Sequence, residues 1–215
     1  MSRSHGLPGE FGADAWTAPA RTPLYYPDAV TLAPGADRAA LVSRVDTAAP
    51  GATVKDSFAD LDLAEAGFHV LFDAQWLHRP ASGAARAPGL SWDVLRDPVA
   101  LRAWALAWDG GDGNADLFRP ALLDDPATFV LAGRSADGRV LAGAVASRSD
   151  QVVGVSNVFG LDGGPDAAWP GVLDTVHELF PTLPVVGYEQ GEDLTAAVRH
   201  GFEPVAPLRI WLHSQ

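Results

Sequence analysis

The chain has 215 residues, of which 47% are hydrophobic and 20% charged, so a hydrophobic core is available and a disordered chain is excluded. Its formal net charge is −12 and Lys55 is its one lysine, which excludes nucleic acid and disfavours an anionic membrane surface, because basic side chains drive both kinds of binding. The chain has no cysteine, which excludes a disulfide framework, a zinc–thiolate site and a thiol nucleophile.

The N-terminal part of the chain predicts an arm followed by a small β–α–β element. Residues 1–23 mix glycine, proline, alanine and polar residues without periodicity, a pattern typical of an irregular arm. The next segments read as a short strand at 29–32, a helix at 36–45 and a weaker strand at 54–63. We therefore expect residues 24–65 to form an added N-terminal element beside a main core over residues 66–215, within one continuous domain.

A longer strand is predicted at residues 68–76. Apolar residues there alternate with His69, Asp73 and Gln75, which is the period of two that a strand shows. If the polar face lines a cleft, Asp73 and Gln75 bind substrate and Trp76 adds an aromatic wall. The alternative is a half-solvated sheet face with Trp76 in the core.

The rest of the chain alternates helices and strands, with an antiparallel meander in the middle. Asp97 and Pro98 match an N-cap followed by proline in the first turn, so a helix is expected from there to Gly110. Turn residues at 137–138 and 149–150 separate three β-like runs, as in tight hairpins. The expected elements are a loop at 80–90, a helix at 98–109, strands at 128–134, 139–148 and 151–159, a helix at 166–180, a strand at 185–189, a helix at 192–200 and strands at 202–206 and 208–212.

This order of elements and the segment from Val185 to Trp211 resemble the GNAT superfamily of acyl-CoA-dependent N-acetyltransferases. The segment reads as a strand, a short helix that ends in Gly201-Phe202, and two closing strands, as in that family. The resemblance covers residues 66–215 and implies an α/β (α+β) fold with a mixed, mainly antiparallel central sheet flanked by helices. The added N-terminal β–α–β element lies outside the resemblance.

The resemblance also implies where a cofactor would bind. In the family the fourth and fifth core strands, here 151–159 and 185–189, diverge, and the pantetheine arm of acetyl-CoA or another acyl-CoA pairs with backbone groups in the gap. Glycines in the next loop receive the pyrophosphate at a helix N-terminus. The expected cofactor-binding residues are Val155, Ser156, Asn157 and Val158 in the first of these strands and Gly163 and Gly164 in the loop. Ser156 and Asn157 have the alternative role of satisfying neighbouring backbone groups.

The same mechanism requires a base for the acceptor amine and an acid for the leaving thiolate. Glu189 ends the buried strand and would be the base if burial raised its pKa; otherwise it is a solvated carboxylate or a partner of Arg199 or Arg209. Many family members supply the acid as a tyrosine four residues before the glycine of Gly-Phe, where this chain has Ala197. Tyr188 or a water molecule is then the expected acid.

Two departures from the family pattern keep a second function open. The first departure is Ala197 in the place of the tyrosine. The second is in the loop, which lacks the Arg or Gln that family members place before the glycines and carries Asp162 and Asp166 instead. A carboxylate that faces a phosphate is unfavourable. The sequence therefore predicts an acyl-CoA-dependent N-acetyltransferase acting on an unidentified small-molecule amine, or a catalytically inactive GNAT-like ligand-binding or regulatory module that does not use acetyl-CoA.

No metal site is expected. Asp112, Asn114 and Asp116 have the spacing of the first ligands in a calcium loop, but Leu117 and Leu123 occupy the positions that need glycine and glutamate. The N-terminus lacks the apolar stretch of a signal peptide, which favours the cytoplasm. A homodimer is left open by the sequence.

Overall fold

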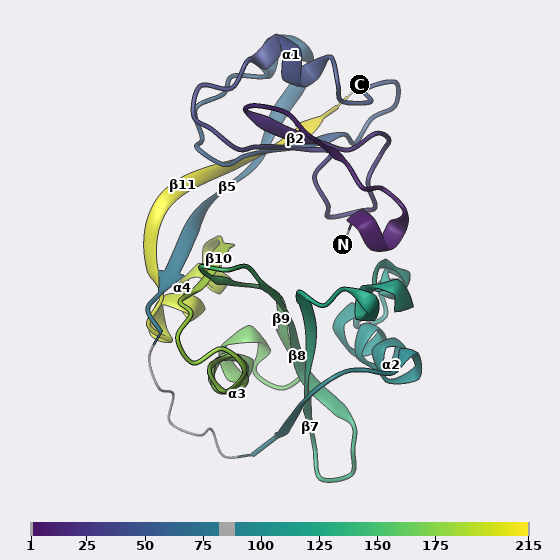
Figure 1. Ribbon diagram of the computed structural model, residues 1–215, viewed down its shortest axis with the longest axis vertical. Coiled ribbons are helices and arrows are strands. Elements are labelled where there is room, and N and C mark those ends of the chain that lie inside the picture. Colours follow the sequence, from purple (N-terminus) through teal and green to yellow (C-terminus); the bar gives the residue numbers. More distant parts are fainter. Residues whose placement is uncertain (1, 82–88, 215) are drawn as a thin grey trace. The chain divides into compact units, whose positions relative to one another are not determined.

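The computed structural model describes residues 2–81 and 89–214, shown as ribbons in Figure 1. The chain divides into two compact units. The first contains Met1–Gln75 and Ala206–Gln215, and the second contains Trp76–Val205.

The first unit consists of short strands and short helices. Its elements are η1 (Ser2–His5), β1 (Glu10–Phe11), β2 (Ala15–Thr17), β3 (Ala29–Thr31), α1 (Arg38–Val42), β4 (Thr53–Asp56) and η2 (Ala64–Ala66), with parts of β5 (Phe68–Arg79) and β11 (Glu203–His213). The segment expected to be an irregular arm thus carries two strands, which are too short to show a periodicity. The strand expected at 54–63 ends at Asp56, because this carboxylate accepts hydrogen bonds from Phe58 N at 3.3 Å and Leu61 N at 2.9 Å and so turns the chain.

The second unit has longer elements. They are β6 (Ser91–Val94), α2 (Pro98–Asp109), η3 (Ala115–Leu117), η4 (Pro120–Asp124), β7 (Thr128–Arg134), β8 (Val140–Arg148), β9 (Val153–Gly160), α3 (Gly164–Leu179), β10 (Val185–Glu189) and α4 (Gly191–Arg199). The predicted meander and the helices on either side of it are confirmed. The sequence does not predict β6, and the loop expected at 80–90 lies partly outside the described residues.

The last part of the chain is one strand, β11, where the sequence predicts two strands around Pro207. The ladder of β11 with β4 begins at Arg209, which pairs with Asp56. Pro207 precedes that ladder, so none of its hydrogen bonds requires the N–H that proline lacks.

The described strands follow the order β1-β2-β3-β4-β11-β5-β10-β9-β8-β7-β6 in the sheet. The pairs β3–β4 and β10–β9 are parallel, whereas β1–β2, β2–β3, β11–β4 and the successive pairs from β6 to β9 are antiparallel. This mixed, mainly antiparallel sheet flanked by helices confirms the predicted α/β fold class. None of the described helices is long and apolar enough to cross a bilayer.

Two helices cover opposite faces of β7, β8 and β9 (Figure 1). On one face, Trp104 of α2 donates from Nε1 to the Leu131 carbonyl at 2.8 Å and lies edge-on to Phe159, with 5.2 Å between the ring centroids. Gly143 makes room for the indole, since a Cβ there would lie 2.1 Å from Trp104 Nε1. On the other face, α3 buries Val172 in a core shared with β8 and β9.

Candidate functional site

The central strands β9 and β10 are paired over only part of their length. Their parallel register joins Val185 with Val153 and Val186 with Gly154, and within the described chain this ladder includes no later pair. β9 nevertheless continues well beyond Gly154. The edge of β9 that would face β10 therefore has backbone groups that the sheet does not use.

Alternate residues of β9 turn their backbone groups towards β10. Val153 donates its N–H to Pro184 O at 2.9 Å, and a Cβ at Gly187 would lie 3.0 Å from the Val155 carbonyl oxygen. Asn157 is the next residue in this alternation and lies beyond the end of the ladder. The opening between the two strands thus begins next to Val155.

A β-bulge at Asn157 lies inside this opening. Ser156 pairs with Val145 and Phe159 with Gly143, so two residues of β9 oppose one residue of β8. Asn157 has a φ of 54°, in the left-handed region that residues other than glycine rarely adopt, and its Nδ2 donates to Ser156 Oγ at 3.0 Å. Backbone strain of this kind clusters at functional sites.

Tyr188 and Glu189 lie on opposite faces of β10, because neighbouring residues of a strand alternate. Tyr188 lies edge-on to Trp76 of β5, with 5.7 Å between the ring centroids. Glu189 instead lies within the electrostatic influence of Asp193 in α4. The structure thus brings Tyr188 together with Trp76 and places Glu189 on the side of α4.

Both predicted catalytic side chains have raised pKa values. Burial, with a smaller contribution from the negative charge of Asp193, raises the pKa of Glu189 to about 7. Burial, followed by the charge of Glu189, raises the pKa of Tyr188 above its usual value. At neutral pH Glu189 therefore exchanges between its protonated and ionised forms, as suits a general base, whereas the Tyr188 phenol keeps its proton.

The loop after β9 enters α3 through Gly163 and Gly164, which have φ values of 83° and 65°. Asp166 follows in the first turn of α3, where Arg199 Nη2 lies 3.1 Å and His200 Nε2 3.0 Å from its Oδ1. Desolvation opposes ionisation of Asp166, but the hydrogen bonds from Arg199 and His200 outweigh it, and the pKa of Asp166 is lowered. Arg199 at the end of α4 therefore offsets one of the two acidic charges in the expected phosphate loop.

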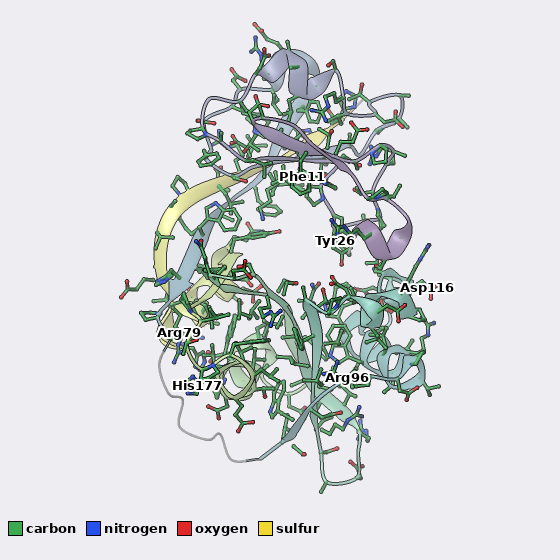
Figure 2. The ribbon with its side chains drawn as sticks, viewed as in Figure 1. Phe11, Tyr26, Arg79, Arg96, Asp116 and His177 are labelled. Atoms are coloured by element: carbon green, nitrogen blue, oxygen red, sulfur yellow. The ribbon has the colours of Figure 1, made fainter. Side chains whose placement is uncertain are left out.

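This contact between α3 and α4 is the part of the site that the sequence does not predict. Sequence reasoning offers Arg199 as a partner for Glu189, whereas in the structure Arg199 binds Asp166. The one available signal is an acid in the first turn of one helix and basic residues at the end of another. Arg79 Nε also donates to the His200 carbonyl at 3.0 Å, which ties β5 to the end of α4 (Figure 2).

The remaining predicted residues belong to different units. Asp73 and Gln75 are part of the first unit, where exposed Asp73 accepts a hydrogen bond from Arg209 Nε at 2.7 Å. Ala197 is fully buried in the core of the second unit. Among residues 2–81 and 89–214, no group of three His, Asp or Glu side chains could hold a metal ion.

Comparisons with known proteins give similarity in structure only. No family model and no curated protein sequence matches the chain. A functionally unknown conserved protein from Staphylococcus epidermidis resembles it with a TM-score of 0.70 at 9% identity, covering 100% of this chain and 98% of that one. A GCN5-related N-acetyltransferase from Kribbella flavida gives 0.65 at 17%, with 96% and 89% covered. An acetyltransferase from the GNAT family of Colwellia psychrerythraea gives 0.53 at 13%, with 96% and 84% covered.

These similarities show that the chain has the GNAT fold, as its sequence resemblance predicts. The first two of these structures cover 100% and 96% of this chain. The similarity therefore extends into residues 1–65 as well as over the predicted core.

Proposed function

We propose that this protein is an acyl-CoA-dependent N-acyltransferase that transfers an acetyl or another acyl group to a small-molecule amine. The observation that carries the proposal is the opening between β9 and β10, where the ladder ends at Gly154 while β9 continues and bulges at Asn157. A strand edge with unused backbone groups binds an extended ligand in the way that a further strand would bind. The pantetheine arm of CoA, which carries two amide groups, is a ligand of this kind.

The residues around the opening fit such a cofactor. Residues 155–158 provide the backbone edge, and Gly163 and Gly164 lead into α3, whose N-terminus favours a pyrophosphate. The ion pair of Asp166 with Arg199 reduces the repulsion that this acid would exert on phosphates. When bound, an acyl-CoA supplies the acyl group as a thioester.

Glu189 and Tyr188 are the proposed base and acid. A pKa of about 7 lets ionised Glu189 take a proton from the acceptor amine near neutral pH. Tyr188 keeps its proton at that pH and can give it to a leaving group. The acceptor amine gives up a proton and the leaving thiolate takes one up at a different atom. Glu189 and Tyr188, on opposite faces of the end of β10, can therefore serve these two groups separately. Trp76, which contacts Tyr188, is the proposed aromatic wall for the acceptor.

Release of free thiol tests this proposal. The chain has no cysteine, so a thiol-reactive chromophore reports only the CoA that is set free. Acetyl-CoA and longer acyl-CoAs, offered with a panel of primary amines, should give amine-dependent thiol release. Glu189→Gln should lower kcat by about 100-fold or more, the typical contribution of a general base.

The matched control for this substitution is Glu192→Gln. Glu192 is an exposed acid in the first turn of α4, so the same chemical change there should leave thiol release unchanged. Equal losses in both variants, or thiol release that does not depend on any amine, would contradict the proposed role of Glu189.

A catalytically inactive ligand-binding or regulatory module of the same fold is the second candidate function. The observation that favours it is Ala197, which stands where many family members have their acid and is buried in the core. Saturable binding of an acyl-CoA without thiol release from any amine would support an inactive module. Absence of acyl-CoA binding at millimolar concentration would support a module that does not use this cofactor.

A further inference from the structure

A separate concavity in the second unit lies between the start of α2 and the segment that contains η3 and η4. Its volume is about 360 Å³, which lies within the range of small-molecule sites. Leu101 and Phe118 line it and are buried, whereas Arg102, Asp116 and Arg119 line it from exposed positions. Figure 2 labels Asp116.

The apolar floor of this pocket is held in place by an aromatic cluster. Phe118 lies edge-on to Trp104 and to Trp108, with 4.8 Å between the ring centroids in each case. Leu101 precedes Trp104 by one helical turn of α2 and is 1% exposed. The floor is therefore a fixed surface on which the apolar part of a ligand can rest.

The rim of the pocket is positively charged, which is unusual in a chain with a net charge of −12. Arg102 Nη1 lies 2.6 Å from Asp116 Oδ1, but the two side chains are 52% and 91% exposed, so this pair contributes little and a ligand carboxylate can replace Asp116. Within the described residues, no hydrogen bond or ion pair involves the Arg119 side chain. The Arg119 guanidinium is thus available to a ligand, and the Arg102 guanidinium is only weakly held by Asp116.

The N-terminus of α2, beside the pocket, does not supply the hydrogen-bond donors that an anion would need. Asp97 already accepts hydrogen bonds from Val99 N at 2.9 Å and Ala100 N at 3.3 Å, and Pro98 has no N–H. An anion in this pocket would therefore be bound by the arginine side chains, which match a carboxylate in two-pronged geometry.

We propose that this pocket binds a small carboxylate with an apolar body, such as an aryl or alkyl acid. The carboxylate lies between Arg102 and Arg119, and the apolar body rests on Leu101 and Phe118. This site is independent of the opening between β9 and β10, so it stands whether or not the protein transfers acyl groups.

Ligand-observed NMR on the full chain, with phenylacetate as the probe and phenylacetamide as its neutral analogue, tests this site. Phenylacetate should bind saturably and at least ten-fold more tightly than the amide. Arg119→Gln should weaken phenylacetate binding by about ten-fold, the effect of losing one charge-assisted contact. Asp116→Asn should strengthen binding by about three-fold, because Arg102 loses its internal competitor.

The matched control is Arg148→Gln, which removes the same charge from an exposed residue at the end of β8 and should leave the affinity unchanged. Arg119 is exposed, so an unchanged thermal midpoint will show that its variant is folded. The proposal is overturned if phenylacetate fails to bind at millimolar concentration, if the amide binds equally well, or if Arg148→Gln weakens binding as much as Arg119→Gln.

Discussion

The two units of the chain are stabilised in different ways. Among the described residues, the buried polar side chains of the first unit are Thr17, Asp28, Thr31, Asp56 and His213, whereas those of the second unit are Asp109 and Thr175. Strands β1 to β4 have two to four residues, but β7 to β9 have seven to nine. Short strands pair few of the backbone groups around them, and the buried carboxylates of Asp28 and Asp56 each accept hydrogen bonds from two backbone N–H groups.

The second unit relies on aromatic side chains that lie directly on glycines. Gly143 makes room for Trp104, and Gly133 and Gly171 make room for Trp92, whose ring a Cβ at either glycine would meet at less than 3 Å. The antiparallel ladders from β6 to β9 pair these strands along their length, so the fit between side chains decides how the helices pack on them. Loss of a buried carboxylate should therefore damage the first unit, and added volume at Gly143 or Gly171 should damage the second.

The largest effect is expected from Gly143→Ala. The added methyl would lie 2.1 Å from Trp104 Nε1 and 2.9 Å from the Leu131 carbonyl, so α2 must shift and the free energy of unfolding should fall by about 3 kcal/mol. Urea unfolding gives the value, and hydrogen exchange should show the lost protection in the second unit. Gly154→Ala is the matched control on β9: its nearest neighbour would be 3.7 Å away, so the loss should stay below about 1 kcal/mol.

Asp28→Ala tests the first unit. Asp28 is 2% exposed and accepts hydrogen bonds from Thr22 N at 2.7 Å and Thr53 N at 2.8 Å. Removal leaves these part-buried N–H donors unpaired, which should cost about 2 kcal/mol and lower hydrogen-exchange protection in the first unit only. Asp46→Ala removes an exposed carboxylate that accepts from Ala48 N and should change stability by less than about 0.5 kcal/mol. Protection lost equally in both units would contradict the assignment of Asp28 to one unit.

Glu189→Gln should alter the pH dependence of stability. The pKa of Glu189 is raised to about 7 in the folded protein, above its value of about 4.3 when unfolded. Between these values the folded state binds more protons than the unfolded state, so wild-type stability falls as pH rises towards 7 and then levels off. Relative to wild type, the Gln variant should gain stability on the order of 1–2 kcal/mol at pH 8, after allowance for partial exposure, and nothing near pH 4. If the difference in the free energy of unfolding between wild type and Glu189→Gln is the same at pH 4 and pH 8, the pKa of Glu189 is not raised.

The sequence predicts the second unit better than the first because longer elements repeat their apolar pattern more often. The helix from Pro98 and the meander show clear periodicity and turn residues, whereas β1, β2 and β6 are too short to show any. Within the candidate site, the position of Tyr188 and Glu189 follows from the strand that contains them. The bulge at Asn157 depends on packing against another strand, and no local pattern in the sequence encodes it.

The pairing of Asp166 with Arg199 and His200 is equally non-local, and it changes what the loop acids are expected to do. Asp162 and Asp166 are alike in the sequence, but among the described residues Asp166 forms an ion pair with Arg199 and contacts His200. The lowered pKa of Asp166 keeps it ionised down to acid pH, so its charge is present wherever acyl-CoA binding is measured. Asp162→Asn removes one charge from the loop, whereas Asp166→Asn also releases Arg199 towards a phosphate.

If the loop receives the pyrophosphate, Asp166→Asn should tighten acyl-CoA binding by about three-fold and Asp162→Asn by less than about two-fold, both effects fading at high salt. Adding Arg199→Gln to Asp166→Asn should reverse the larger gain, because the released guanidinium is its cause. The thermal midpoint should not change, since the ion pair of Asp166 with Arg199 is exposed. Weaker binding in Asp166→Asn would mean that the contact with α4 instead holds the loop in its binding conformation. Titration calorimetry of acyl-CoA with the three variants and wild type distinguishes these two explanations.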